Sequence, residues 1–85
     1  LWQELTDEYF FCKSLREDTE WSYNKVIRGF RKHIGDNCSP YNITTRDVLE
    51  WRRNVLKKQG LSAHTWNNKV SHMRALYNFL LTSQT

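Results

Sequence analysis

Apolar side chains recur at helical spacing in four segments of this chain. The clearest segment lies between Asp18 or Thr19, either of which can cap a helix, and Gly35, which can end one. At about 100° per residue its large apolar side chains fall within roughly 100° of arc, and they are Tyr23, Val26, Ile27, Phe30 and Ile34. We therefore expect a helix here that packs one stripe against a core.

A shorter segment, about residues 6–13, predicts a helix before it. Thr6 is a suitable N-cap, because Asp7 and Glu8 then fall in the first turn, where the helix dipole favours acidic side chains. The buried face of this helix would be Leu5, Tyr9 and either Phe10 or Phe11.

Two further helices are expected in the second half of the chain. Thr44 opens one of them, with Asp47 in the capping-box position, and Gly60 ends it. Ser62 opens the other, which runs to about Leu81. Their apolar stripes are Val48, Trp51 and Val55 in the former, and Trp66, Val70, Met73, Tyr77 and Leu80 in the latter.

These segments predict one domain with an all-α fold. Eighty-five residues are enough for one domain and too few for two. One Pro and three Gly supply little turn punctuation for a multi-stranded sheet, and residues 38–42 form the loop between the second and third helices. We expect a compact four-helix bundle over residues 1–85, cut from a larger protein, since the chain begins without Met and ends in a polar run.

Charge is distributed unevenly along the chain. Residues 1–20 hold six acids and two bases, a net charge of −4, whereas residues 21–85 hold eleven bases and three acids, a net charge of +8. Such asymmetry is typical of a protein with a polyanionic partner. No apolar run is long enough to span a membrane, so we expect nucleic acid and no membrane contact.

No set of residues with catalytic or metal-binding spacing is present in the sequence. His33, His64 and His72 lack the paired spacing of metal ligands, and no Gly-rich phosphate loop or nucleophile motif occurs. Cys12 and Cys38 have neither zinc-site spacing nor the density of a disulfide scaffold, which favours two free thiols in a reducing cytosol. We expect no catalytic centre, no metal and no cofactor.

The second helix has a basic face opposite its apolar stripe. Lys25, Arg28 and Lys32 share this face with Trp21, and no acid occurs between Trp21 and Gly35. A solvated helix exterior is the simple explanation, but such surfaces usually mix charges of both signs. Trp21 either packs over the first helix or stacks on a ligand.

The fourth helix has an uncharged polar flank close to its start. His64, Asn67, Asn68 and Ser71 offer hydrogen-bond donors and acceptors there. Helix starts bind phosphate, and Asn side chains can recognise adenine in the major groove. A merely solvated flank is the alternative for each of these residues.

Three short motifs occur in order along the chain. They are Thr19-Glu20-Trp21-Ser22-Tyr23 with Ile27 and Phe30, then Ile43-Thr44 with Asp47-Val48, then Gly60-Leu61-Ser62 with Thr65, Asn67, Val70-Ser71, Met73-Arg74 and Tyr77. Together they cover about residues 3–82 and resemble the N-terminal core-binding domain of tyrosine recombinases and phage integrases.

The resemblance implies a SAM-like bundle that clamps one side of duplex DNA at a recombination core site. The catalytic domain would follow in the same chain and clamp the other side, with further recombinase protomers in the full assembly. Motif position implies contacts to DNA from Thr19, Ser22, Lys25, His64, Asn67 and Asn68. To these the helical wheel adds Arg28 and Lys32 as partners of backbone phosphates. Many relatives have a basic residue in place of Asn68, which weakens the case for phosphate pairing there.

Two other classes of protein fit the same pattern less well. A SAM- or CARD-like interaction module would use the basic face against an acidic protein. A helix-turn-helix regulator is disfavoured, because the connection over residues 38–42 is too long for that motif. We expect a bacterial or phage-encoded protein of the cytoplasm.

Overall fold

The described part of the chain is built from α-helices joined by short connections. The structure is a computed structural model that describes residues 2–35 and 37–82. Its elements are α1 (Trp2–Lys13), α2 (Glu17–Ile34), the 3₁₀ turn η1 (Pro40–Asn42), α3 (Thr45–Arg53), the π-helical turn η2 (Asn54–Lys58) and α4 (Ala63–Thr82). The expected all-α four-helix bundle is confirmed.

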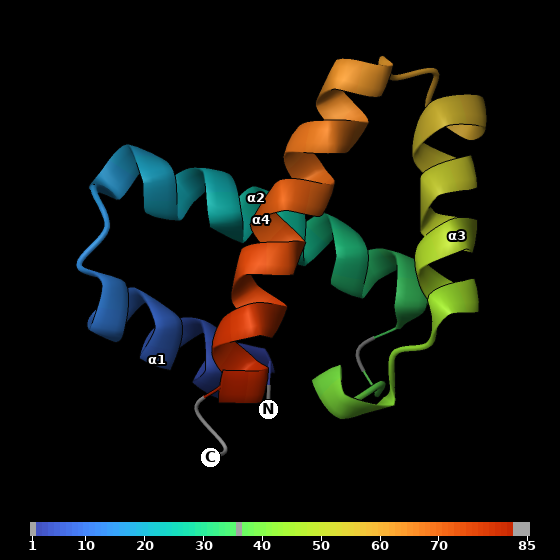
Figure 1. Cartoon of the computed structure of the whole chain (residues 1–85). Coiled ribbons are helices and arrows are strands. Elements are labelled where there is room, and N and C mark those ends of the chain that lie inside the picture. Colours follow the sequence, from blue (N-terminus) through green and yellow to red (C-terminus); the bar gives the residue numbers. More distant parts are fainter. Residues whose placement is uncertain (1, 36, 83–85) are drawn as a thin grey trace.

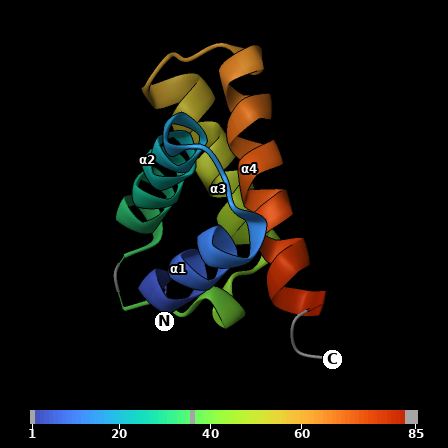
Figure 2. The same cartoon turned by 90° about the vertical axis from the view of Figure 1, so that its left-hand side faces the viewer.

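Helices α2 and α4 cross near their middles. Figure 1 shows α4 running across α2, with α3 to one side and α1 below. Figure 2, turned by 90°, shows α2 and α4 side by side, with α1 below them in the view. Each crossing helix therefore buries one face and leaves the opposite face exposed.

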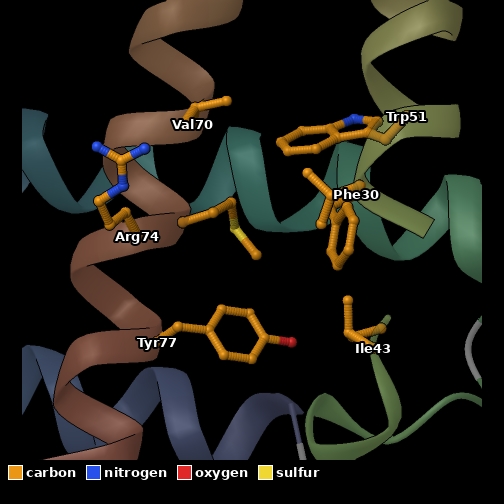
Figure 3. Close-up of a pocket in the computed structure, with 8 residues that line it drawn as sticks. Phe30, Ile43, Trp51, Val70, Arg74 and Tyr77 are labelled. Carbon is orange, nitrogen blue, oxygen red and sulfur yellow. The ribbon is translucent and has the colours of Figure 1, made fainter. Parts of the chain in front are cut away.

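A series of edge-to-face aromatic contacts joins all four helices. The ring of Trp2 on α1 lies 5.9 Å from that of Phe30 on α2. The ring of Phe30 lies 4.8 Å from that of Trp51 on α3, and Trp51 lies 4.9 Å from Trp66 on α4. Figure 3 shows how the Phe30 and Trp51 side chains lie next to each other. Such pairs add directional stabilisation to the burial of large apolar area. The expected stripes are confirmed, since their members are buried or half-buried.

The starts of the first two helices were predicted wrongly. Thr6 is not an N-cap, because α1 begins at Trp2. Thr6 lies within the helix, and its buried hydroxyl donates to the Trp2 carbonyl at 2.8 Å. The side chain of Phe11 is 82% exposed, whereas Phe10 packs against the core. Neither Asp18 nor Thr19 caps α2, which begins at Glu17.

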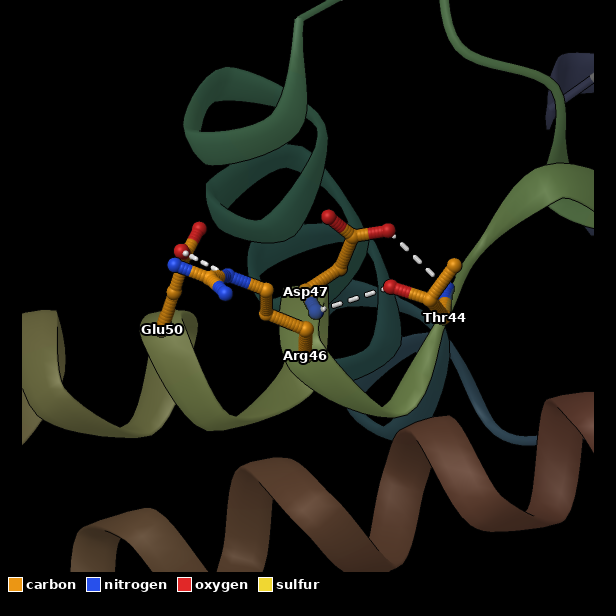
Figure 4. A network of polar contacts seen from close by, with 4 residues as sticks. All are labelled: Thr44, Arg46, Asp47 and Glu50. Atoms are coloured by element: carbon orange, nitrogen blue, oxygen red, sulfur yellow. Dashed lines mark hydrogen bonds and ion pairs between the residues drawn. The ribbon is translucent and has the colours of Figure 1, made fainter.

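The starts of the last two helices were predicted correctly. Thr44 and Asp47 form a reciprocal capping box: the Thr44 hydroxyl accepts from the Asp47 N–H at 3.2 Å, and the Asp47 carboxylate accepts from the Thr44 N–H at 2.9 Å (Figure 4). The Ser62 hydroxyl accepts from the Thr65 N–H at 3.2 Å. These bonds satisfy backbone donors that a helix start otherwise leaves unpaired.

The connection between α2 and α3 is anchored to two other helices. Trp2 Nε1 donates to the carbonyl of Cys38 at 2.7 Å, and the hydroxyl of Tyr77 on α4 donates to the carbonyl of Pro40 at 2.8 Å. Burial raises the pKa of Tyr77 above its ordinary value, so this hydroxyl keeps its proton. The expected loop is therefore a fixed turn, which holds the start of α3 in place.

Candidate nucleic-acid interface

The outer face of α2 carries three exposed cations between Lys25 and Lys32. Lys25, Arg28 and Lys32 are exposed, as the helical wheel predicts, while Val26 and Ile27 between them are buried. In the part of the chain that the structure describes, none of these three cations forms an ion pair. This face is therefore available to an external anion.

Trp21 belongs to the same face and not to the core. Its side chain is 62% exposed, and the ammonium of Lys25 lies 4.5 Å from the centre of its ring. An ammonium over an indole face is attracted by the ring quadrupole. Trp21 is therefore not buried by α1, and it offers a flat aromatic surface beside the cations.

The first turn of α2 differs from the rest of this face. It carries three carboxylates, those of Glu17, Asp18 and Glu20. Thr19 in this turn and Ser22 just after it are half-buried, and the Ser22 hydroxyl donates to the carbonyl of Asp18 at 3.2 Å. These two candidates are thus less accessible than the three cations, which begin one turn further along.

On α4 the polar flank is exposed and partly ordered by its own hydrogen bonds. His64, Asn67 and Asn68 all face solvent. The Asn68 amide donates to Nε2 of His64 at 3.5 Å, and the Asn68 carbonyl accepts from Nδ1 of His72 at 2.6 Å. Asn67 makes no side-chain hydrogen bond to any described residue, and its side chain projects about 100° away from that of Asn68.

His72 connects the polar flank of α4 to α2. Its ring lies 4.4 Å from the ring of Tyr23, whose hydroxyl bonds that of Tyr9 on α1 at 3.0 Å. Burial, and then this hydrogen bond, raise the pKa of Tyr23, so the hydroxyl remains neutral. The contact places the turn that holds Asn68 beside the first half of α2. From the sequence, His72 could only be judged against metal-ligand spacing, because spacing within one helix does not reveal which helices meet.

A hollow with a mainly apolar lining lies between α2, α3 and α4. It has a volume of about 260 Å³, and Figure 3 shows Arg74 at its edge with Val70, Trp51 and Tyr77 around it. Its lining includes no carboxylate, Cys or His. Across residues 2–35 and 37–82, no group of three or more His, Cys, Asp or Glu residues is placed to hold a metal ion. Within the same residues, no helix is both long and apolar enough to cross a membrane.

Comparison with known proteins identifies relatives over nearly the whole chain. The family described as "Phage integrase, N-terminal SAM-like domain" matches residues 3–84. A protein of Pseudomonas aeruginosa named "Putative tyrosine recombinase XerC" is 37% identical over 79 residues, which are 93% of this chain and 18% of the relative. A protein of the same name from Pseudomonas syringae is 36% identical over 78 residues, 92% of this chain and 16% of that relative. The chain thus spans less than a fifth of these relatives, and no solved structure matches it.

Proposed function

Because this chain belongs to the family of phage integrase N-terminal SAM-like domains, we propose that it holds duplex DNA at recombination core sites. In this proposal it is the N-terminal clamp of a tyrosine recombinase that works in DNA integration and site-specific recombination. The two relatives named as tyrosine recombinases support this assignment. The observation that carries it is the cationic face of α2, which forms no ion pair with a described carboxylate and has Trp21 exposed beside it.

In this function α2 supplies affinity. Lys25, Arg28 and Lys32 pair with backbone phosphates, and the counterions released from the DNA drive binding without reading the sequence. These residues span seven positions, about 10 Å along the helix axis, over which duplex DNA carries several phosphates. Thr19 and Ser22 lie at the less accessible end of this surface, and we assign them backbone contacts there.

Helix α4 supplies contacts within the groove. The exposed side chains of Asn67 and Asn68 carry no charge, and neither does that of His64 when its imidazole is neutral. They therefore gain little binding energy from phosphate alone. An Asn amide can donate to and accept from adenine at once, which suits it to base recognition. The Tyr23–His72 contact keeps this flank at a fixed position relative to the α2 cations.

The chemistry of strand exchange belongs, in this proposal, to a catalytic domain elsewhere in the same protein. We assign this chain no catalytic residue and no cofactor, and we expect it to meet its own catalytic domain and other recombinase protomers in the assembly. We place the protein in the bacterial cytoplasm, where the DNA is.

The test is a titration of the chain with short duplex DNA at several salt concentrations. With roughly five phosphates neutralised, the logarithm of the binding constant should fall with the logarithm of salt at a slope of about −4 to −5. Lys25→Ala should weaken binding to every duplex and lower the slope by about 1. Lys13→Ala, an exposed cation at the end of α1, is the matched control and should have little effect.

Two results would overturn the proposal. A flat salt dependence would favour the protein-interaction module instead, because such a module has no reason to release counterions from DNA. Nicking of supercoiled plasmid by the pure chain would show a catalytic centre within it.

A further inference from the structure

A second cationic site lies where the end of α2 meets α3. A surface hollow of about 360 Å³ opens there, lined by His33, Glu50, Arg53, Asn54 and Lys58. Figure 1 shows the C-terminal end of α2 against the side of α3, so the hollow joins two elements that are far apart in the sequence. Two full cations and an imidazole therefore face one small volume.

The carboxylate in this hollow is already engaged. Glu50 Oε1 accepts from Nε of Arg46 at 3.0 Å (Figure 4). Arg46 does not line the hollow, so the ion pair holds the Glu50 carboxylate toward the outside of the hollow. Arg53 and Lys58 form no ion pair with any described residue. The net charge offered to a ligand is positive.

The π-helical turn η2 brings the two cations together. Residues five apart in an α-helix point about 140° away from each other. In η2 the backbone N–H of Gln59 instead donates to the backbone carbonyl of Asn54, five residues back, at 3.0 Å. The side-chain amide of Gln59 also donates to Oδ1 of Asn54, at 2.6 Å. This widened turn places Arg53 and Lys58 on one side, where both line the hollow. Single π-helical turns occur frequently at functional sites.

A second hollow on the same segment suits an anion less well. Its lining consists of Arg52, Arg53 and Lys57 with Leu49 and Leu56, and the Leu49 side chain is 57% exposed. Apolar side chains beside a phosphate would displace water that the anion needs. Arg53 thus lies between the two hollows, and only the hollow that it shares with Lys58 combines cations with polar neighbours.

We propose that the hollow formed by His33, Arg53, Asn54 and Lys58 binds a backbone phosphate of the same DNA duplex. This inference rests on the DNA binding proposed above and extends the contact surface beyond α2 and α4. The cationic face of α2 ends at Lys32, directly before His33, so the hollow lies at the same end of α2 as the last cation of that face. An Arg guanidinium bonds two phosphate oxygens at once, and a Lys ammonium adds a point charge.

The experiment compares two double variants of equal charge. Arg53→Ala with Lys58→Ala removes the cations of the proposed site, and Arg52→Ala with Lys57→Ala removes the two cations that line only the second hollow. All four side chains are exposed, so both variants should melt within a few degrees of the parent chain. We expect the first variant to lose roughly tenfold in duplex affinity and about 1 in salt slope, and the second to lose only about two- to threefold through long-range charge.

A third variant tests the sign of the effect at the same site. Glu50→Gln removes the only negative charge among the described residues that line the hollow, and it should raise duplex affinity by about two- to threefold. Equal losses in the two double variants, or no gain from Glu50→Gln, would overturn the phosphate site. If Lys25→Ala still weakens binding in that case, the proposed function stands without it. If the parent chain binds no DNA, both proposals fall.

Discussion

Helices α2 and α4 cross in the middle of the bundle, bury equivalent faces and expose opposite kinds of chemistry. The exposed face of α2 holds cations and an indole, which can attract any polyanion. The exposed flank of α4 holds Asn and His side chains, which form directional hydrogen bonds and carry little net charge. The difference indicates that affinity and sequence choice are divided between two helices of one domain. A change on either helix should therefore alter one property and spare the other.

The largest expected effect separates the buried face of α2 from its exposed face. Phe30→Ala removes a ring that contacts both Trp2 and Trp51, and it should lower the free energy of unfolding by about 3–5 kcal/mol. Arg28→Ala, two positions earlier on the exposed side, should change it by about 0.5 kcal/mol or less. Denaturant unfolding of both variants, followed by circular dichroism, measures the two values. If Arg28→Ala were the more destabilising, the division of α2 into faces would be wrong.

The next effect concerns what α4 recognises. Asn67→Ala or Asn68→Ala should lower affinity for the cognate core site more than for a scrambled duplex, by about 1–3 kcal/mol of discrimination. Lys25→Ala should lower both affinities by a similar factor. Competition titrations at one salt concentration give the ratio for each variant. An unchanged ratio in both Asn variants would remove sequence choice from α4.

Asn67 and Asn68 differ in how firmly their side chains are held. The Asn68 side chain is hydrogen-bonded to His64, and Asn68 lies in the turn that His72 fixes against α2. The Asn67 side chain projects about 100° away and makes no hydrogen bond to a described residue. An ordered amide loses less rotational entropy when it binds a base. We expect the larger change in discrimination from Asn68→Ala.

The smallest effect is a pH dependence at the contact between the two helices. Tyr23 and Tyr77 have pKa values raised above the ordinary value of about 10, so folding is favoured fully below that pH. Stability should decline as pH rises above about 10, because the unfolded chain then releases these protons more readily than the folded chain. Tyr23→Phe should cost about 1 kcal/mol at neutral pH through loss of its bond to Tyr9, and should lose less stability than the parent chain above pH 10. Urea melts at pH 8 and pH 11 measure this difference.

Local signals account for the parts of the fold that sequence reasoning predicted correctly. The stripes of α2 and α4 follow from helical periodicity alone, and the caps at Thr44 and Ser62 form between residues three apart. The start of α1 depends instead on Trp2, which packs on Phe30 and bonds the carbonyl of Cys38, far away in the sequence. A cap residue such as Thr6 cannot compete with these tertiary contacts.

The same distinction applies to the candidate site. The helical wheel correctly predicted that Lys25, Arg28 and Lys32 are exposed. The side chains opposite a core stripe can be identified from the periodicity of one helix alone. The wheel could not settle whether Trp21 was covered by α1, since that depends on how two helices pack. The Tyr23–His72 contact and the hollow at Arg53 each form where two elements pack together. The spacing of residues along the chain does not predict which elements pack together.

The exposure of Trp21 gives this domain a built-in optical reporter. The other three Trp side chains are buried, and two of them contact each other edge to face, so their emission reports on the core. Trp21 alone emits from water, with an ammonium over its ring. A soluble quencher will reach this indole first, and a ligand on the α2 face will shield it. Folding and occupancy can therefore be followed separately in one unlabelled sample, by two populations of the same fluorophore.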